Sequence, residues 1–153
     1  MSAKLLIDPH DKAEILARLR AVRPDAVRRW GRMTAGQMIC HLTDSFLGMM
    51  GEKQAVIPRF SFWRLTKWVA LYGPGQWPHG VKTRPEFEQG IGGTPPAQFE
   101  ADLSALLATI ERFTQSPRLF EFRPHPMFGR MTDREWMRWA YLHCDHHLRQ
   151  FGE

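Results

Sequence analysis

Cysteine is scarce in this sequence of 153 residues, and long hydrophobic runs are absent from it. Two cysteines, Cys40 and Cys144, are too few for a disulfide framework, which favours a reducing, cytoplasmic location. No apolar stretch approaches the ~20 residues that span a bilayer, and the first residues lack the hydrophobic stretch of a secretory signal. We therefore expect neither membrane association nor export.

The sequence also lacks long runs of one charge, and alternation of hydrophobic and polar residues is nowhere sustained. The first absence argues against nucleic-acid binding, and the second against a sheet protein. Hydrophobic residues make up 43% and charged residues 24%, and we expect a single globular domain over residues 1–153. The net charge of +5 mildly favours anionic ligands. If the arginine-rich first third bound nucleic acid, the affinity would fall steeply with salt.

Helical periodicity, by contrast, recurs along the chain. It predicts helices over residues 9–22, 34–50, 61–72, 94–113 and 133–150. Start signals precede four of them, namely Asp8-Pro9, the pair Thr34 and Gln37, Thr94-Pro95, and the pair Thr132 and Glu135. A long segment rich in glycine and proline follows Tyr72. The pattern predicts an all-α bundle of four substantial helices, with one short extra helix and a long loop.

The last predicted helix carries two histidines four residues apart, His143 and His147. On a helix both imidazoles lie on one face, one turn apart, where they can bind one metal ion. They extend a stripe formed by Trp136, Ala140 and Gln150, and this stripe should face the interior. Without a metal, a buried pair of histidines would have to stay neutral and find hydrogen-bond partners.

His41 lies on the predicted inward side of the second helix, beside Met38 and Ser45. A core histidine with satisfied hydrogen bonds is the alternative interpretation. Three histidine ligands would leave one coordination position open for water or substrate, which is the catalytic arrangement. Imidazole suits zinc, nickel, iron or copper. The zinc-protease pattern is absent, because Cys-Asp-His rather than a glutamate follows His143.

Three further side chains are candidates for catalytic roles. Asp44 lies one turn after His41 and could orient its imidazole or contact the metal. His146 could carry protons beside His147, and His125 lies in a loop that leads into the last helix. For each there is a structural alternative: a carboxylate on the helix surface for Asp44, a surface or interface histidine for His146, and a turn residue for His125.

Two other features have structural interpretations. Cys40 and Cys144 each adjoin a proposed ligand in the sequence, but adjacent helical residues point about 100° apart, so we expect both to pack in the core. The stretch from Phe60 to Trp77 is rich in tryptophan and also contains Arg64 and Lys67. It favours core packing or a lid over a site, ahead of a dimer contact or a membrane-surface helix.

The sequence resembles the DinB/YfiT-like superfamily of metalloenzymes, and most closely a branch of unknown function that ends in a similar motif. The matching segments are MTAGQMICH at residues 33–41, HPMFG at 125–129, Trp136, and HCDHHLRQFG at 143–152. The commoner ending of the superfamily is His-His-Arg-Gly-Gln. Here Leu148 and Arg149 replace Arg-Gly, whereas Gln150 is retained.

The resemblance implies a four-helix bundle of up-down-down-up topology with a divalent metal ion, zinc, nickel or iron, held by His41, His143 and His147. Because characterised relatives include thiol-dependent transferases and isomerases, it implies a metal-activated thiolate or water that attacks a small-molecule substrate. The reaction would be a transfer that uses a low-molecular-weight thiol, or a hydrolysis. Homodimers are common among relatives. The alternative is a non-catalytic metal-binding or stress-response bundle, with Asp44 or His125 as a fourth ligand.

Overall fold

The computed structural model describes residues 3–56 and 63–153, with residues 63–65 described by their backbone alone. The described chain forms five α-helices and one short 3-10 helix, in the order α1 (Pro9–Ala21), α2 (Ala35–Met49), α3 (Trp63–Tyr72), η1 (Pro85–Phe87), α4 (Phe99–Phe113) and α5 (Asp133–Gln150). These residues contain no β-strand, only two isolated bridges. The all-α prediction is confirmed at this level.

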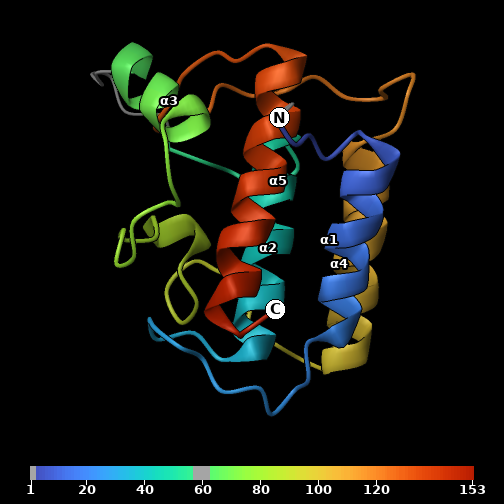
Figure 1. Ribbon diagram of the computed structural model, residues 1–153. Helices are drawn as coiled ribbons and strands as arrows, with labels where there is room; N and C mark the ends of the chain where they lie inside the picture. Colours follow the sequence, from blue (N-terminus) through green and yellow to red (C-terminus); the bar gives the residue numbers. More distant parts are fainter. Residues whose placement is uncertain (1–2, 57–62) are drawn as a thin grey trace.

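Helices α1, α2, α4 and α5 lie side by side, and each contacts two of the others (Figure 1). In Figure 1, α5 and α1 lie in front, with α2 and α4 behind them. Helices α1 and α5 run in one direction, and α2 and α4 run in the other. The short helix α3 and the irregular segment after it lie to one side, against α5 and α2.

The predicted helix starts are correct for α1, α2 and α5, where Asp8, Thr34 and Thr132 accept backbone N–H groups of the first turn. The prediction for α4 is wrong by several residues. This helix begins at Phe99 rather than at Thr94, and Gln98 provides no side-chain cap. The predicted short helix was expected from residue 61, but residues 61 and 62 lie outside the described chain.

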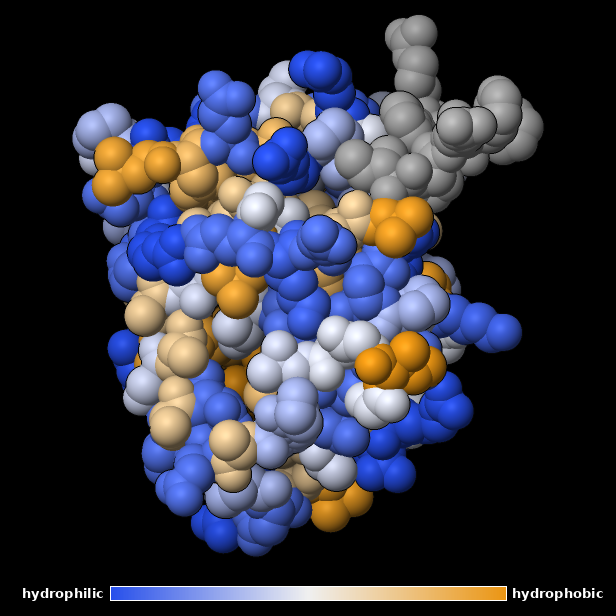
Figure 2. All heavy atoms as spheres, turned by 180° about the vertical axis from the view of Figure 1, so that it is seen from behind, coloured by the Kyte–Doolittle hydropathy of each residue, from blue (hydrophilic) through white to orange (hydrophobic). Residues whose placement is uncertain are grey.

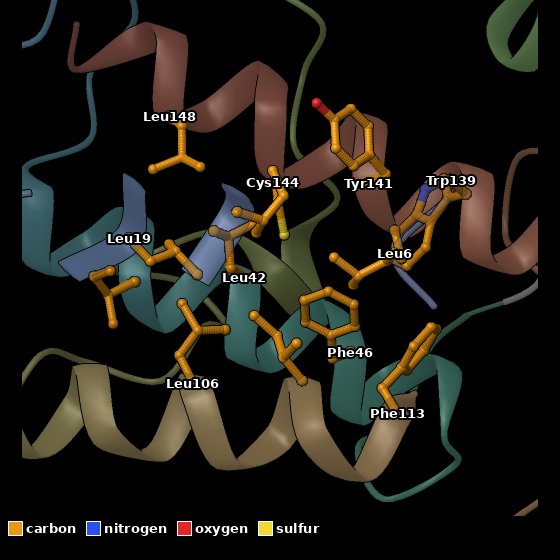
Figure 3. Packing of buried hydrophobic residues seen from close by; sticks show 14 of the residues in the cluster. Leu6, Leu19, Leu42, Phe46, Leu106, Phe113, Trp139, Tyr141, Cys144 and Leu148 are labelled. Atoms are coloured by element: carbon orange, nitrogen blue, oxygen red, sulfur yellow. The ribbon is translucent and has the colours of Figure 1, made fainter. Parts of the chain in front are cut away.

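The core forms where the helices meet (Figure 3). Phe46 of α2 packs edge-on against Phe113 of α4, with 4.8 Å between the ring centroids, and Trp139 of α5 lies near both rings. The predicted packing of both cysteines is confirmed, since Cys40 is 5% exposed and Cys144 is fully buried. The core therefore holds α2 against α5, the two helices that carry the predicted ligands.

The surface is mostly polar on the face turned away in Figure 1. Hydrophobic residues are scattered singly among hydrophilic ones on that face (Figure 2). Scattered apolar side chains of this kind are normal for a protein surface. Within the described residues, none of the helices has the length and hydrophobicity needed to cross a bilayer.

Candidate metal centre

The three predicted ligands come together between α2 and α5. One ring nitrogen each of His41, His143 and His147 lies within 4.8 Å of the others. Nε2 of His41 lies 3.3 Å from Nε2 of His143, and the ring centroids of His41 and His147 are 4.7 Å apart. The pairing of α2 with α5 thus brings together residues separated by about two thirds of the chain.

Local sequence places these side chains at the helix interface. On α5, Trp136 and Ala140 precede His143 at helical spacing and are almost completely buried, so the whole stripe faces the interior. On α2, His41 is 5% exposed, and the Ser45 hydroxyl one turn later donates a hydrogen bond to its carbonyl oxygen at 2.8 Å. The predicted inward orientation of both helix faces is correct.

In two of the three imidazoles, a hydrogen-bond acceptor near Nδ1 determines which ring nitrogen carries the proton. Nδ1 of His41 lies 3.1 Å from the carbonyl oxygen of Phe87, which can only accept. Nδ1 of His147 lies 3.1 Å from Oε1 of Gln150, whose amide nitrogen donates to the carbonyl oxygen of Trp30 at 2.8 Å. Each Nδ1 therefore carries the proton, and the lone pairs of His41 and His147 are on Nε2. Hydrogen bonds of this type commonly orient metal-ligating histidines.

The arrangement of the three ring nitrogens is compatible with a bound metal ion. Without a metal, a proton on Nε2 of His143 could form a hydrogen bond with the Nε2 lone pair of His41 or of His147, but not with both. A metal ion would instead bind the Nε2 lone pairs of all three histidines. Nδ1 of His143 is buried and has no hydrogen-bond partner among the described residues, so no acceptor orients this ring as Phe87 and Gln150 orient the other two. A tetrahedral ion with Zn–N bonds of ~2.0–2.1 Å holds its nitrogen ligands ~3.3–3.4 Å apart, and the separation between Nε2 of His41 and Nε2 of His143 is 3.3 Å.

Electrostatics keep the three imidazoles neutral. Burial lowers the pKa of His41. Burial also lowers the pKa values of His143 and His147 well below their usual range, and the neighbouring histidines lower them further. Neutral imidazole is the form that binds metal ions, so no proton has to be displaced at physiological pH.

A cavity of about 620 Å³ opens beside the three histidines. Its walls come from α2, from α3, from the segment between Gly73 and Phe87, from residues 125–128 and from α5. Most of the lining is apolar, and Trp77, Phe87 and Trp139 supply large aromatic surfaces. The side of the triad that the protein leaves open therefore faces a chamber large enough for a small molecule.

The aromatic stretch has features of both core packing and a lid. Leu71 of α3 is 1% exposed and belongs to the hydrophobic core, whereas other residues of α3 border the cavity. Thr66 and Ala70 of α3 line the cavity, and the Trp77 indole donates a hydrogen bond to the carbonyl oxygen of Ala70 at 2.7 Å. Core packing is wrong for Trp68, which is 59% exposed. Phe60 lies outside the described residues, and the side chains of residues 63–65 are not described.

His125 lies on the cavity wall and outside the triad. Its Nδ1 accepts hydrogen bonds from the backbone N–H groups of Met127 and Phe128, at 3.1 and 3.2 Å. Its ring stacks on Phe128 with 4.4 Å between centroids and meets the edge of Trp139. Burial, together with the positive charge of Arg84, lowers the pKa of His125 to about 3. The residue has the predicted turn role and also faces the candidate site.

His146 also lines the cavity, next to His147. Its Nδ1 is buried without a hydrogen-bond partner among the described residues, and burial lowers its pKa to about 4. The rings of Trp77 and His79 lie about 6 Å from it, and His79 in turn stacks on Trp30 at 3.9 Å. His146 is therefore neither an exposed surface residue nor one of the three converging ligands.

Among the described residues, Asp44 makes no hydrogen bond to His41 and is not part of the group of converging ring nitrogens. It is 1% exposed, so it is not a surface carboxylate. Its oxygens accept hydrogen bonds from the backbone N–H and the hydroxyl of Thr94, both at 2.7 Å, and an ion pair links it to Lys53 at 3.2 Å. Asp44 thus ties the chain before α4 to α2, which is why Thr94 does not cap α4. Its charge acts on His41 only at a distance, by slightly opposing the lowering of that pKa.

Sequence reasoning missed three parts of the site. Helical spacing places Gln150 on the inward stripe, but does not predict its contact with His147. The Phe87 carbonyl carries no side-chain signal and could not have been found. Arg149, which stands in the changed part of the terminal motif, binds Asp145 at 2.9 Å and Oε1 of Gln76 at 2.5 Å. It therefore anchors the cavity wall to α5.

Comparison with known proteins provides one assignment. No curated protein and no solved structure is significantly similar to this chain. The family model described as "Protein of unknown function (DUF1569)" matches residues 2–153. Because this match covers nearly the whole chain, including all three converging histidines and the cavity beside them, the chain belongs to the DUF1569 family.

Proposed function

We propose that this protein is a divalent-metal-dependent enzyme of the DinB-like type, which acts on a small molecule through an activated water or thiol. The convergence of three neutral ring nitrogens, next to a cavity, carries the proposal. The helix directions seen in Figure 1 support the corresponding four-helix bundle of up-down-down-up topology. Zinc, nickel and iron all suit imidazole ligands, and a low-molecular-weight thiol is the proposed co-substrate for a transfer reaction.

Three groups of residues would have separate roles in this reaction. His41, His143 and His147 hold the ion, which when bound polarises the substrate or lowers the pKa of a bound water or thiol. Phe87 and Gln150 keep two of these rings in the ligating orientation. The walls formed by α3 and by the segment after it cover part of the cavity, and such walls would reduce the contact of a bound substrate with bulk water.

A structural metal site is the competing proposal, and it requires a fourth protein ligand. Asp44 and His125 were the candidates for that ligand. Among the described residues, the group of ligand atoms that contains the triad includes neither. Asp44 is bound to Thr94 and Lys53 instead. An open coordination position that faces a cavity favours catalysis over a structural role.

Metal analysis of the purified, tag-free protein tests the proposal. We expect about one equivalent of metal in the wild type, as three converging ligands predict, and loss of this metal in the His41→Ala and His143→Ala variants. His10→Ala is the matched control, because His10, Asp11 and Glu14 form a second group of possible ligands on the surface. A folded His143→Ala variant with the metal content of the wild type would refute the proposal.

The oligomeric state and the reaction are tested separately. We infer a homodimer from the superfamily resemblance, and light scattering coupled to size-exclusion chromatography measures it directly. If the metal is present, thiol-transfer and hydrolysis reactions are screened with that metal. Activity that depends on both the metal and an added thiol would identify a transferase, and activity with water alone would identify a hydrolase.

A further inference from the structure

The side chain of His125 has a hydrogen-bond donor for which the described part of the chain provides no acceptor. Because Nδ1 accepts two backbone N–H groups, it cannot carry a proton. The neutral ring must therefore carry its proton on Nε2. The side chain belongs to a residue that is only 8% exposed, and no hydrogen bond to Nε2 exists among the described residues. Nε2 is not a fully buried atom, so it is accessible from the cavity that His125 lines, where a ligand can accept its hydrogen bond.

The orientation of this donor is rigid. The His125 ring stacks on Phe128 with an interplanar angle of 11°, and Trp139 meets it edge-on at 5.4 Å. Trp139 also lies 5.0 Å from the ring of His143. His125 and the triad thus flank the same indole within one cavity. A small molecule that lies across Trp139 can therefore reach both.

The charges around the cavity restrict what can bind there. Its described lining includes two cationic side chains, Lys82 and Arg84, and no carboxylate. Arg84 is already paired with Glu86, whereas Lys82 is exposed. A positively charged molecule would find no counter-ion on this wall, and burial of an unpaired charge is unfavourable. A neutral molecule does not meet this penalty, and Lys82 provides a counter-charge for an anion.

We infer that the cavity binds a small molecule with an apolar, ring-sized body and a carbonyl or carboxylate oxygen that accepts the hydrogen bond of His125 Nε2–H. The inference rests on the proposed function, since it names the substrate class of the same site. It makes His125 a substrate-positioning residue. Aromatic and aliphatic walls take the apolar body, and the polar end lies between His125 and the triad.

A matched series of ring compounds tests this inference on metal-free protein, prepared with a chelator. Toluene supplies the body alone, benzamide adds a neutral acceptor, benzoate adds an anionic one, and benzylamine adds a cation. Binding is followed by tryptophan fluorescence, because Trp77 and Trp139 line the cavity, and by ligand-observed NMR. We expect benzamide and benzoate to bind about five- to tenfold more tightly than toluene, and benzylamine to bind more weakly than toluene.

His125→Asn is the informative variant. The amide oxygen of asparagine can replace Nδ1 as acceptor of the Met127 and Phe128 N–H groups, but no donor remains at the position of Nε2. We expect the variant to bind toluene like the wild type and to lose the five- to tenfold preference for benzamide. Thermal unfolding verifies that it is folded.

Three results would overturn the inference: equal binding of toluene and benzamide to the wild type, an unchanged preference in His125→Asn, or no binding of any probe to either protein. None of these depends on a metal. Failure of the proposed metal function would instead appear as absence of metal from a wild type that still discriminates between the probes. Repetition with metal-loaded protein then measures whether the ion strengthens benzoate binding further.

Discussion

Gln150 offers the sharpest test of how this site is built, because it contacts one ligand and would not itself bind the metal. Its Oε1 accepts the Nδ1 proton of His147 at 3.1 Å, and its Nε2 donates to the Trp30 carbonyl oxygen at 2.8 Å. The residue is 4% exposed, so water cannot readily replace either partner. Gln150→Leu keeps most of the volume and removes both hydrogen bonds.

The expected effect has two parts. Loss of the orienting acceptor of a ligating histidine typically weakens metal binding by about 10- to 100-fold. That factor corresponds to ~1.4–2.7 kcal/mol of binding free energy. In the metal-free protein, the His147 Nδ1–H and the Trp30 carbonyl both lose their partners. Each unpaired buried group costs ~1–3 kcal/mol, so the two groups together give a loss of about 2–6 kcal/mol in the free energy of unfolding.

Chelator competition measures the zinc affinity, and urea unfolding of the metal-free protein measures stability. Gln150→Glu is the control, because a carboxylate still accepts from His147 but no longer donates to Trp30. We expect it to retain wild-type metal affinity while being less stable. Gly31→Ala provides a second approach, since its Cβ would lie 2.4 Å from Nε2 of Gln150 and its φ is +78°. It should displace Gln150 and weaken metal binding similarly.

A Gln150→Leu protein that binds zinc as tightly as the wild type would refute this reasoning. So would equal losses of zinc affinity in Gln150→Leu and Gln150→Glu. The first result would mean that the orientation of His147 does not depend on Gln150. The second would mean that the loss arises from the broken contact with Trp30.

Three other outcomes are expected. The pKa of His125, about 3, lies below the ordinary value near 6.5, so between these pH values the unfolded chain binds more protons than the folded chain. The free energy of unfolding should therefore fall as the pH drops from 6.5 toward 3, with a contribution from His125 of up to ~1.4 kcal/mol per pH unit. Urea unfolding at several pH values measures this contribution, which should be absent in His125→Asn. Asp44→Ala leaves Lys53 and Thr94 without their partner and should cost about 3 kcal/mol, measured by urea unfolding. Phe113→Ala opens a cavity in the core and should cost about 3–5 kcal/mol, with metal content per folded molecule unchanged in mass spectrometry.

Periodic features of the chain were predicted well. The capping boxes at Thr34 and Thr132 depend on residues three apart, so they can be read locally, and both are present. The predicted start of α4 at Thr94 is wrong, and the hydrogen-bond partner of Thr94, Asp44, lies 50 residues away in the sequence, where no local pattern reveals it. The burial of Asp44 could not be predicted from local sequence for the same reason, because it depends on a loop that returns to α2.

In the candidate site too, features set by neighbouring residues could be predicted, whereas features set by distant segments could not. Helical spacing alone places His143 and His147 on one face of α5, since one helical turn separates them. Their pairing with His41 came from its inward position and from a family resemblance, and only the contact between α2 and α5 brings the nitrogens within 4.8 Å. Cavity walls from irregular segments leave no periodic signal, so no spacing rule could have predicted them.

The sequence by itself determined the helices, their inward faces and the two-histidine turn of α5, because each of these follows from interactions between residues a few positions apart. Only the tertiary structure decided which nitrogens converge, which carry protons and what surrounds them. The acceptors are a backbone carbonyl of Phe87 and a glutamine amide held by Trp30. Such long-range hydrogen bonds depend on where distant segments fold back, and this is set by packing of the whole core.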